Sequence, residues 1–136
     1  MIVADQADQA HVASQGREIH RGIRGAAGAI GFSTSRTLNH KTKAGIPIPT
    51  LKADEAELTE IAVALGKLGA GWLQVISDFD EPDEEMALLR RLVERSGRPM
   101  SITILQRDNK PEEWRRLMGQ IAAASKAGHQ MMGQVL

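Results

Sequence analysis

The sequence predicts an α/β fold built on a parallel β-sheet. Short apolar segments alternate along the chain with longer segments in which apolar residues recur at helical spacing. Glycines and prolines mark the places where these segments begin and end. The last two helix–strand repeats are about 30 residues apart, which is the length of a βα unit. Strands that alternate with amphipathic helices in this way are typical of parallel sheets with right-handed crossovers.

The composition is that of an ordinary globular domain, and we expect one domain over residues 1–136. Lys and Arg total 17, as do Asp and Glu, so the zero net charge gives no support for nucleic-acid binding. No apolar run approaches the ~18 residues of a membrane span, so no membrane contact is expected. Cysteine is absent, which excludes disulfides and cysteine metal sites. The first nine residues contain two Asp and no basic residue, unlike a signal peptide, and we expect a cytoplasmic protein.

The first predicted elements are a helix over 5–27 and a short strand over 30–33. The helix has a polar amino-terminal half, and residues 1–10 are expected to be frayed. Five consecutive side chains with hydroxyl or guanidinium groups, at 33–37, come next. Ligands of parallel sheets bind at the carboxyl ends of the strands, so this polar segment is predicted either to form part of a site or to close a turn.

A loop and a second helix follow. The segment 39–51 contains a glycine and two prolines, which exclude a helix, and it is interpreted either as a functional loop or as a surface excursion. Asp54 and Glu57 have the spacing of a capping box, so the helix is predicted to begin near Asp54. It is expected to end at one of two glycines, Gly69 or Gly71.

Three further strands and two further helices complete the prediction, with helix starts and stops set by acids, prolines and glycines. They are a strand over 72–79, a helix opening at 80–83 and ending at Gly97, a strand over 100–106, a helix capped by Asp108 or Asn109 and ending at Gly128, and a strand over 131–136.

About four βα units make half of an eight-stranded (βα)8 barrel of the TIM type, so the predicted fold is a partial barrel. Such a half has two edge strands without neighbours, and one face of its sheet has no helices to cover it. These unpaired edges and the uncovered face suggest, as one interpretation of the function, that the chain associates with another chain. The chain would pair its edge strands with a second copy, as a homodimer, or with a complementary barrel half.

Several segments resemble the amidohydrolase type 3 family, which contains the D-aminoacylases, or N-acyl-D-amino-acid deacylases. They are Gly-Ala-Ile-Gly-Phe-Ser-Thr-Ser-Arg-Thr at 28–37, Leu-Gln-Val-Ile-Ser-Asp-Phe at 73–79 and Gly-Arg-Pro-Met-Ser-Ile-Thr-Ile-Leu-Gln at 97–106. With the proline-containing loop, the resemblance extends over most of 25–136. It implies that the chain corresponds to the middle of the family's barrel, roughly strands four to seven.

The resemblance implies a function at family level: zinc-dependent hydrolysis of a non-peptide C–N bond, with an N-acyl amino acid as the small-molecule partner. Family members place metal-binding histidines late in the fifth and sixth strands, where this sequence aligns Ile76 and Ile104. Aliphatic side chains cannot bind zinc, and a slip of one residue would place Ser77 or Thr103 there instead. The first-strand His pair and the last-strand Asp have no counterpart either. We therefore expect no metal ligand and no catalytic residue in this chain, and no activity of the chain by itself.

Six residues are candidates for substrate binding at the rim of the predicted site: Ser33, Ser35, Arg36, His40, Asp78 and Gln106. The planar guanidinium of Arg36 is suited either to a substrate carboxylate or to a salt bridge. Asp78 either faces the site, where it would hold a metal or an ammonium group, or caps the following helix. Gln106 can orient a substrate, and His40 can reach a site from the start of the loop.

Overall fold

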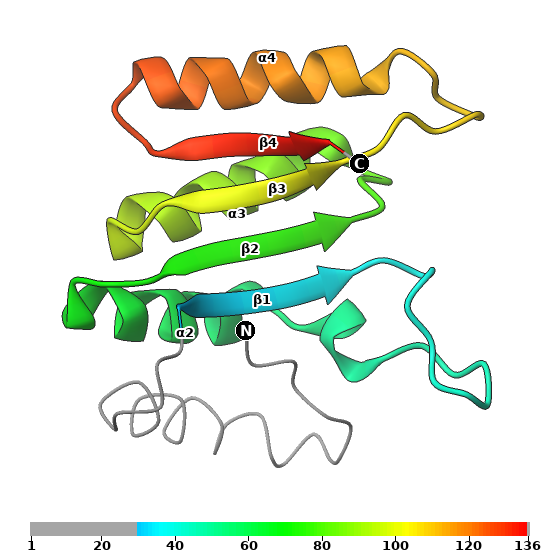
Figure 1. Cartoon of the computed structure of the whole chain (residues 1–136), viewed down its shortest axis with the longest axis horizontal. Coiled ribbons are helices and arrows are strands. Elements are labelled where there is room, and N and C mark those ends of the chain that lie inside the picture. Colours follow the sequence, from blue (N-terminus) through cyan, green and yellow to red (C-terminus); the bar gives the residue numbers. More distant parts are fainter. Residues whose placement is uncertain (1–29, 136) are drawn as a thin grey trace.

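The computed structural model describes residues 30–135, and they form a four-stranded parallel sheet with helices packed against one face (Figure 1). The helix predicted over 5–27 and the fraying predicted for 1–10 lie outside the described residues. The elements, in chain order, are β1 (Gly31–Arg36), the 3-10 helix η1 (Pro49–Lys52), α2 (Glu55–Leu68), β2 (Trp72–Ser77), α3 (Pro82–Ser96), β3 (Met100–Ile104), α4 (Glu113–Lys126) and β4 (Met131–Val135).

The strands lie in the sheet in the order in which they occur in the chain, β1-β2-β3-β4, and each pairs in parallel with the next. One helix connects each strand to its neighbour. In Figure 1, α2 and α3 lie behind the sheet and α4 runs along β4. The predicted α/β class and parallel sheet are therefore confirmed, and the arrangement is compatible with a partial βα repeat.

The core lies between the sheet and the helices. Successive strand residues point to opposite faces of a sheet, so each strand contributes alternate residues to this core. The pairing register aligns them across the sheet: Val75 lies opposite both Thr34 and Ile102. The buried core residues are Leu73, Val75, Met100, Ile102, Ile104 and Met131 from the strands, with Leu58, Leu65, Met86, Leu89, Leu117 and Ile121 from the helices.

Three of the predicted helix boundaries are confirmed by their capping geometry. Asp54 is the N-cap of α2, and its side chain accepts a hydrogen bond of 2.8 Å from the backbone N–H of Glu57. Gly69 and Gly97 end α2 and α3 in the left-handed conformation, with φ of 66° and 62°.

The predicted cap of the last helix is wrong. Neither Asp108 nor Asn109 caps α4, whose N-cap is Glu112. The intervening residues instead close a tight turn, in which the N–H of Lys110 donates to the carbonyl of Arg107 at 3.1 Å. The helix therefore begins a few residues later than the sequence indicated.

The first strand is longer than predicted, and this changes the meaning of its polar residues. The prediction ended the strand at Ser33, whereas β1 extends to Arg36 and pairs with β2 along its whole length. Four of the five polar residues thus belong to the strand itself, and only Thr37 follows it. Period-two alternation divides them between the two faces: Thr34 and Arg36 face the helices, and Ser33 and Ser35 face away.

The face of the sheet turned away from the helices is called the open face below, because no helix among residues 30–135 covers it. Its ten residues, by strand alternation, are Gly31, Ser33, Ser35, Trp72, Gln74, Ile76, Ser101, Thr103, Met132 and Gln134. None of them carries a charge. Trp72 and Met132 are 46% and 40% exposed there.

Candidate functional site: the carboxyl end and the open face of the sheet

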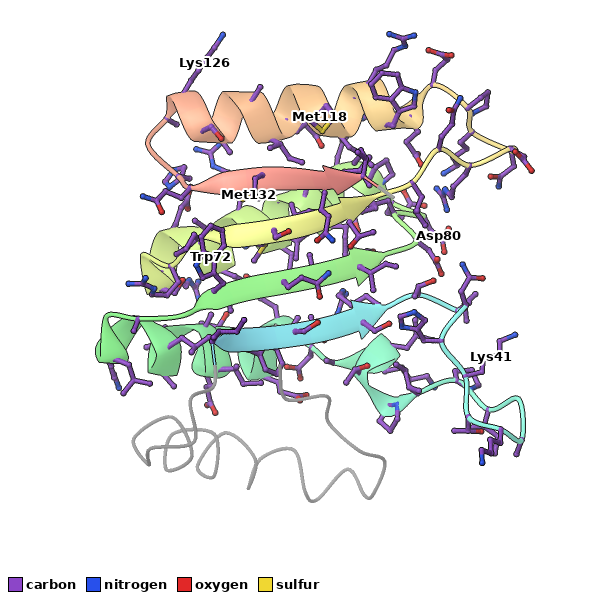
Figure 2. All side chains as sticks on the ribbon, in the orientation of Figure 1. Lys41, Trp72, Asp80, Met118, Lys126 and Met132 are labelled. Atoms are coloured by element: carbon purple, nitrogen blue, oxygen red, sulfur yellow. The ribbon has the colours of Figure 1, made fainter. Side chains whose placement is uncertain are left out.

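A cavity of about 620 Å³ lies at the carboxyl ends of β1 and β2, beside the first turns of α2 and α3. Figure 2 shows Asp80 and Lys41 at this end of the sheet and Trp72 at the other. Six acidic side chains and two arginines line the cavity together with leucines: Glu55, Asp78, Asp80, Glu81, Glu84, Glu85, Arg36 and Arg91. This is the end at which parallel sheets bind ligands.

Arg36, at the end of β1, is held by three hydrogen bonds on the helix side of the sheet. Its Nε donates to Glu85 Oε1 at 2.5 Å, and its Nη2 donates to Glu85 Oε2 at 3.1 Å. Its Nη1 donates to the carbonyl of Ala53 at 2.7 Å. Both side chains of the ion pair are largely buried, at 16% and 14% exposed. Of the two predicted roles, the structure shows the salt bridge, and binding of a substrate carboxylate would require this pair to break.

Asp78 connects the end of β2 to the turn that follows β1. Its Oδ1 accepts from the hydroxyl of Thr37 at 2.5 Å, and its Oδ2 accepts from the backbone N–H of Leu38 at 2.7 Å. Asp78 does not cap the next helix, because the N-cap of α3 is Glu81 and has no side-chain cap. The carboxylate therefore holds the β1 turn in place, and the capping interpretation is wrong.

Two of the candidates lie on the open-face side of β1, Ser33 and Ser35. A third, His40, lies in the turn after this strand. The hydroxyl of Ser35 and Nδ1 of the exposed His40 are 2.6 Å apart. Ser33 donates to the side-chain oxygen of Gln74 on β2. Gln106, in contrast, is exposed in the turn after β3. The six candidates thus do not converge on one point: Arg36 lies on the helix side, the serines on the open face, and Gln106 apart from both.

Two features of this end of the sheet are not predicted by the sequence. Arg107 joins the turn after β3 to neighbouring elements, with Nη2 2.6 Å from Glu113 Oε2 and 3.3 Å from the carbonyl of Phe79. Phe79 itself is buried with a positive φ of 49°, an uncommon conformation for an aromatic residue. An arginine directly after a strand only weakly indicates that its side chain will join neighbouring elements. Nothing in the local sequence indicates the conformation of Phe79.

The first turn of α2 carries two carboxylates whose pKa values are shifted from their ordinary values. The hydrogen bond from Arg91 lowers the pKa of Glu55, with Nε 2.7 Å from Oε1. Burial, and then the nearby charge of Asp54, raises the pKa of Glu57. The ion pair of Glu55 with Arg91 joins α2 to α3, and both side chains line the cavity.

The strand positions that the resemblance aligns with zinc ligands lie on different faces. Ile76 faces the open face, whereas Ile104 is buried in the core on the helix side. Thr103 is the register partner of Ile76 and shares the open face. Among residues 30–135 there is no group of three or more His, Cys, Asp or Glu side chains arranged to hold a metal ion. Zinc therefore remains an implication of the resemblance.

A row of neutral side chains, called the belt below, crosses the open face. Ser33 bonds to Gln74, and Nε2 of Gln74 donates to Oγ1 of Thr103 at 3.1 Å. Ser101 donates to Oε1 of Gln134 at 3.3 Å. The belt consists of hydroxyl and amide groups in two separate hydrogen-bonded sets, one across β1, β2 and β3 and the other between β3 and β4. These groups can form hydrogen bonds with polar groups of a ligand or with the belt of a second copy, but none of them could act as a general base.

No protein-family model, curated protein or solved structure gives a significant match to the chain. In the part of the chain that the structure describes, no helix is both long and apolar enough to cross a membrane.

Proposed function

We propose that this chain is a non-catalytic half-barrel whose function is self-association through its open face. The observation that carries the proposal is the composition of that face, on which ten residues of four strands include no charged side chain. A face of a sheet that remains in water usually carries charged or strongly polar residues, because its alternate positions face the solvent.

The exposed residues of the open face are those that protein interfaces favour. Trp and Met are enriched at interfaces, and charged residues are depleted at interface cores. Trp72 at the start of β2 and Met132 on β4 fit this pattern, and both are substantially exposed. Five polar members of the face are neutral and hydrogen-bonded within the belt, so these five can be buried at little cost.

The second candidate is the family-level function that the resemblance implies, metal-dependent hydrolysis of N-acyl-D-amino acids. The cavity at the carboxyl end of the sheet favours it, because that is where such a barrel would bind substrate. The contacts of the candidate residues favour association instead. Arg36 is paired with Glu85, and Asp78 holds a turn. Ile76 and Ile104 take the strand positions that the resemblance aligns with the family's zinc ligands.

The test is the mass of the protein in solution, measured by light scattering for the wild type and two variants. We expect the wild type to be larger than one chain. Met132→Lys places a charge on the open face and should shift the mass toward the monomer, because burying an unpaired charge is costly. Ala122→Lys, on the exposed side of α4, is the matched control and should leave the mass unchanged. A wild-type monomer with a cooperative melt, or equal masses for both variants, would contradict the proposal.

A further inference from the structure

We propose that the carboxyl end of the sheet is a contact surface between two copies of the chain, in which the basic loop of each copy enters the acidic cavity of the other. The basic loop is the segment 38–52 that follows β1, and the acidic cavity is the one of about 620 Å³ described above. This surface lies apart from the open face, so the inference goes beyond the proposed function and does not depend on it. Its evidence is the opposite charge of the loop and the cavity, their apolar side chains and their position next to each other.

The basic loop carries positive charge that no described residue neutralises. Residues 38–52 include three lysines and one histidine, and no Asp or Glu. The three lysines are exposed, and none of them forms an ion pair with another residue of 30–135: Lys41, Lys43 and Lys52. Figure 1 shows the loop extending past the end of β1. Its ammonium groups are therefore presented to a partner.

The tip of the basic loop is held in shape by internal hydrogen bonds. The N–H of Thr42 donates to the carbonyl of Ile46 at 2.8 Å, and the N–H of Gly45 donates to the carbonyl of Thr42 at 2.9 Å. Below the tip, Lys41 and Pro47 form an isolated β-bridge. A segment that is already ordered loses little conformational freedom when it binds, so the loop is suited to enter a cavity.

The acidic cavity carries the charge opposite to that of the loop. Its six acidic side chains and two arginines give it a formal excess of four negative charges. Both arginines are already paired with carboxylates, so no cationic side chain in the lining is left for the other four acids. Two of these four, Glu81 and Glu84 where α3 begins, are exposed and form no ion pair within the described part of the chain. A cationic segment would find unpaired carboxylates there.

Apolar side chains in both patches favour a protein segment over a small cation as the occupant. Ile46 is 61% exposed on the basic loop. Three leucines line the cavity beside its acids, Leu38, Leu51 and Leu88, and the first of them is 51% exposed. Ile46 of one copy can be buried against these leucines of the other, which removes apolar surface from water. A metal ion or a simple amine could neutralise the acids but would leave this apolar surface exposed.

The position of the two patches makes a second copy the occupant. Leu38 and Leu51 belong to the basic loop and also line the cavity, so the positive and negative patches are neighbours on one surface. A two-fold rotation sets each patch of one copy against the opposite patch of the other, and both loop–cavity contacts then form in a closed pair. A basic partner of another kind would fill the cavity and leave the loop unpaired. The zero net charge of the chain also means that two copies do not repel each other at long range.

The salt dependence of the mass of the wild type is the first test. The Debye length falls from about 10 Å at 0.1 M salt to about 3 Å at 1 M, so exposed charge pairs are screened at the higher concentration. We expect the mass measured by light scattering to fall to about half or less between the two conditions, because loss of one two-fold contact halves a closed assembly. Equal masses at both salt concentrations would overturn the inference.

Charge reversal is the second test, and it names the two patches. The loop variant Lys41→Glu/Lys43→Glu and the cavity variant Glu81→Lys/Glu84→Lys each remove the attraction between identical copies. Each variant alone should therefore have the lower mass at 0.1 M salt. A mixture of equal amounts should recover the wild-type mass, because each loop then meets a cavity of opposite charge. A damaged fold in either variant could not be repaired by mixing, so failure to recover the mass would overturn the inference.

The control is Lys67→Glu/Lys126→Glu, which changes the net charge by the same amount as the loop variant. Both lysines are exposed and lie in the last turns of α2 and α4, away from the carboxyl ends of the strands. We expect this variant to keep the wild-type mass at 0.1 M salt. A loss of mass equal to that of the loop variant would show that net charge alone is responsible, and would overturn the inference.

The outcomes separate this contact from the proposed function. A mass that responds to Met132→Lys but not to salt or to the loop variant would overturn the contact and leave association through the open face standing. A mass that responds to salt and recovers on mixing, but does not respond to Met132→Lys, would support the contact and contradict the proposed function.

Discussion

At the scale of single residues, the ion pair between Arg36 and Glu85 explains why a polar strand can lie against an apolar core. Arg36 is the last residue of β1 on the helix side, where an unpaired guanidinium would be costly to bury. The two bonds to Glu85 and the bond to the Ala53 carbonyl satisfy it. The pair thereby joins β1 to α3 and to the segment that leads into α2.

Removing one partner of this pair should be more harmful than removing both. Arg36→Met leaves the largely buried carboxylate of Glu85 without its partner, and we expect a loss of about 3 kcal/mol in the free energy of unfolding. The double variant Arg36→Met/Glu85→Leu should recover much of that loss. Urea denaturation of the two single variants and the double variant measures the coupling. Additive losses would show that the pair contributes nothing.

Local signals predicted some residue roles and could not predict others. The cap at Asp54 was predictable because an N-cap side chain and the backbone N–H that donates to it lie three residues apart. The contacts of Asp78 and Arg36 were not, since their partners are 40 and 49 residues away in the sequence. An isolated sequence gives the chemistry of such side chains and leaves their partners undetermined.

At the scale of elements, α2 and α3 approach closely at Gly66. A Cβ atom at this position would lie 2.3 Å from the carbonyl oxygen of Ser96, at the end of α3. The small residue therefore sets how near the two helices can pack. Gly119 in α4 differs, because a Cβ there would meet nothing within 4 Å.

This contrast gives a paired prediction. Gly66→Ala forces the helices apart, and we expect a loss of about 1–3 kcal/mol in the free energy of unfolding. Gly119→Ala should gain about 0.5–1 kcal/mol, because alanine is the better helix former and has room here. Thermal melts of both variants measure whether each substitution lowers or raises the stability of the protein. A stabilised Gly66→Ala variant would contradict the close approach.

The elements themselves were predicted well where periodicity and glycine stops agree, as in α2 and α3. The extent of β1 was missed because serine and threonine in a row read as a turn, whereas pairing with β2 holds them in a strand. The start of α4 was missed because a turn closed by Lys110 uses the residues that looked like a cap.

At the scale of the whole molecule, the parallel sheet and the uncovered face followed from the order of the predicted elements alone. The arrangement of the candidate site did not follow from that order, because the alternation along β1 places Arg36 and the two serines on opposite faces of the sheet. Strand register decides which face of the sheet each side chain lies on, and the register depends on the partner strand.

The whole chain is expected to show no amide hydrolysis by itself. The purified protein, supplied with zinc and an N-acyl-D-amino acid, should release no free amino acid above a blank that contains the metal alone. The physical reason is that Ile76 and Ile104, at the strand positions that align with the family's ligands, have aliphatic side chains that cannot bind zinc. Turnover above the blank, abolished by a chelator, would contradict this expectation and favour the second candidate function.

The neutrality of the open face also has a kinetic consequence. Complementary charges accelerate the encounter of two proteins, and pairs without them associate at about 10⁵–10⁶ M⁻¹ s⁻¹. Two uncharged faces gain nothing from long-range attraction, so salt should leave their association rate nearly unchanged. An assembly formed through this face would then depend for its persistence on slow dissociation, set by the apolar and neutral contacts that Trp72, Met132 and the belt provide.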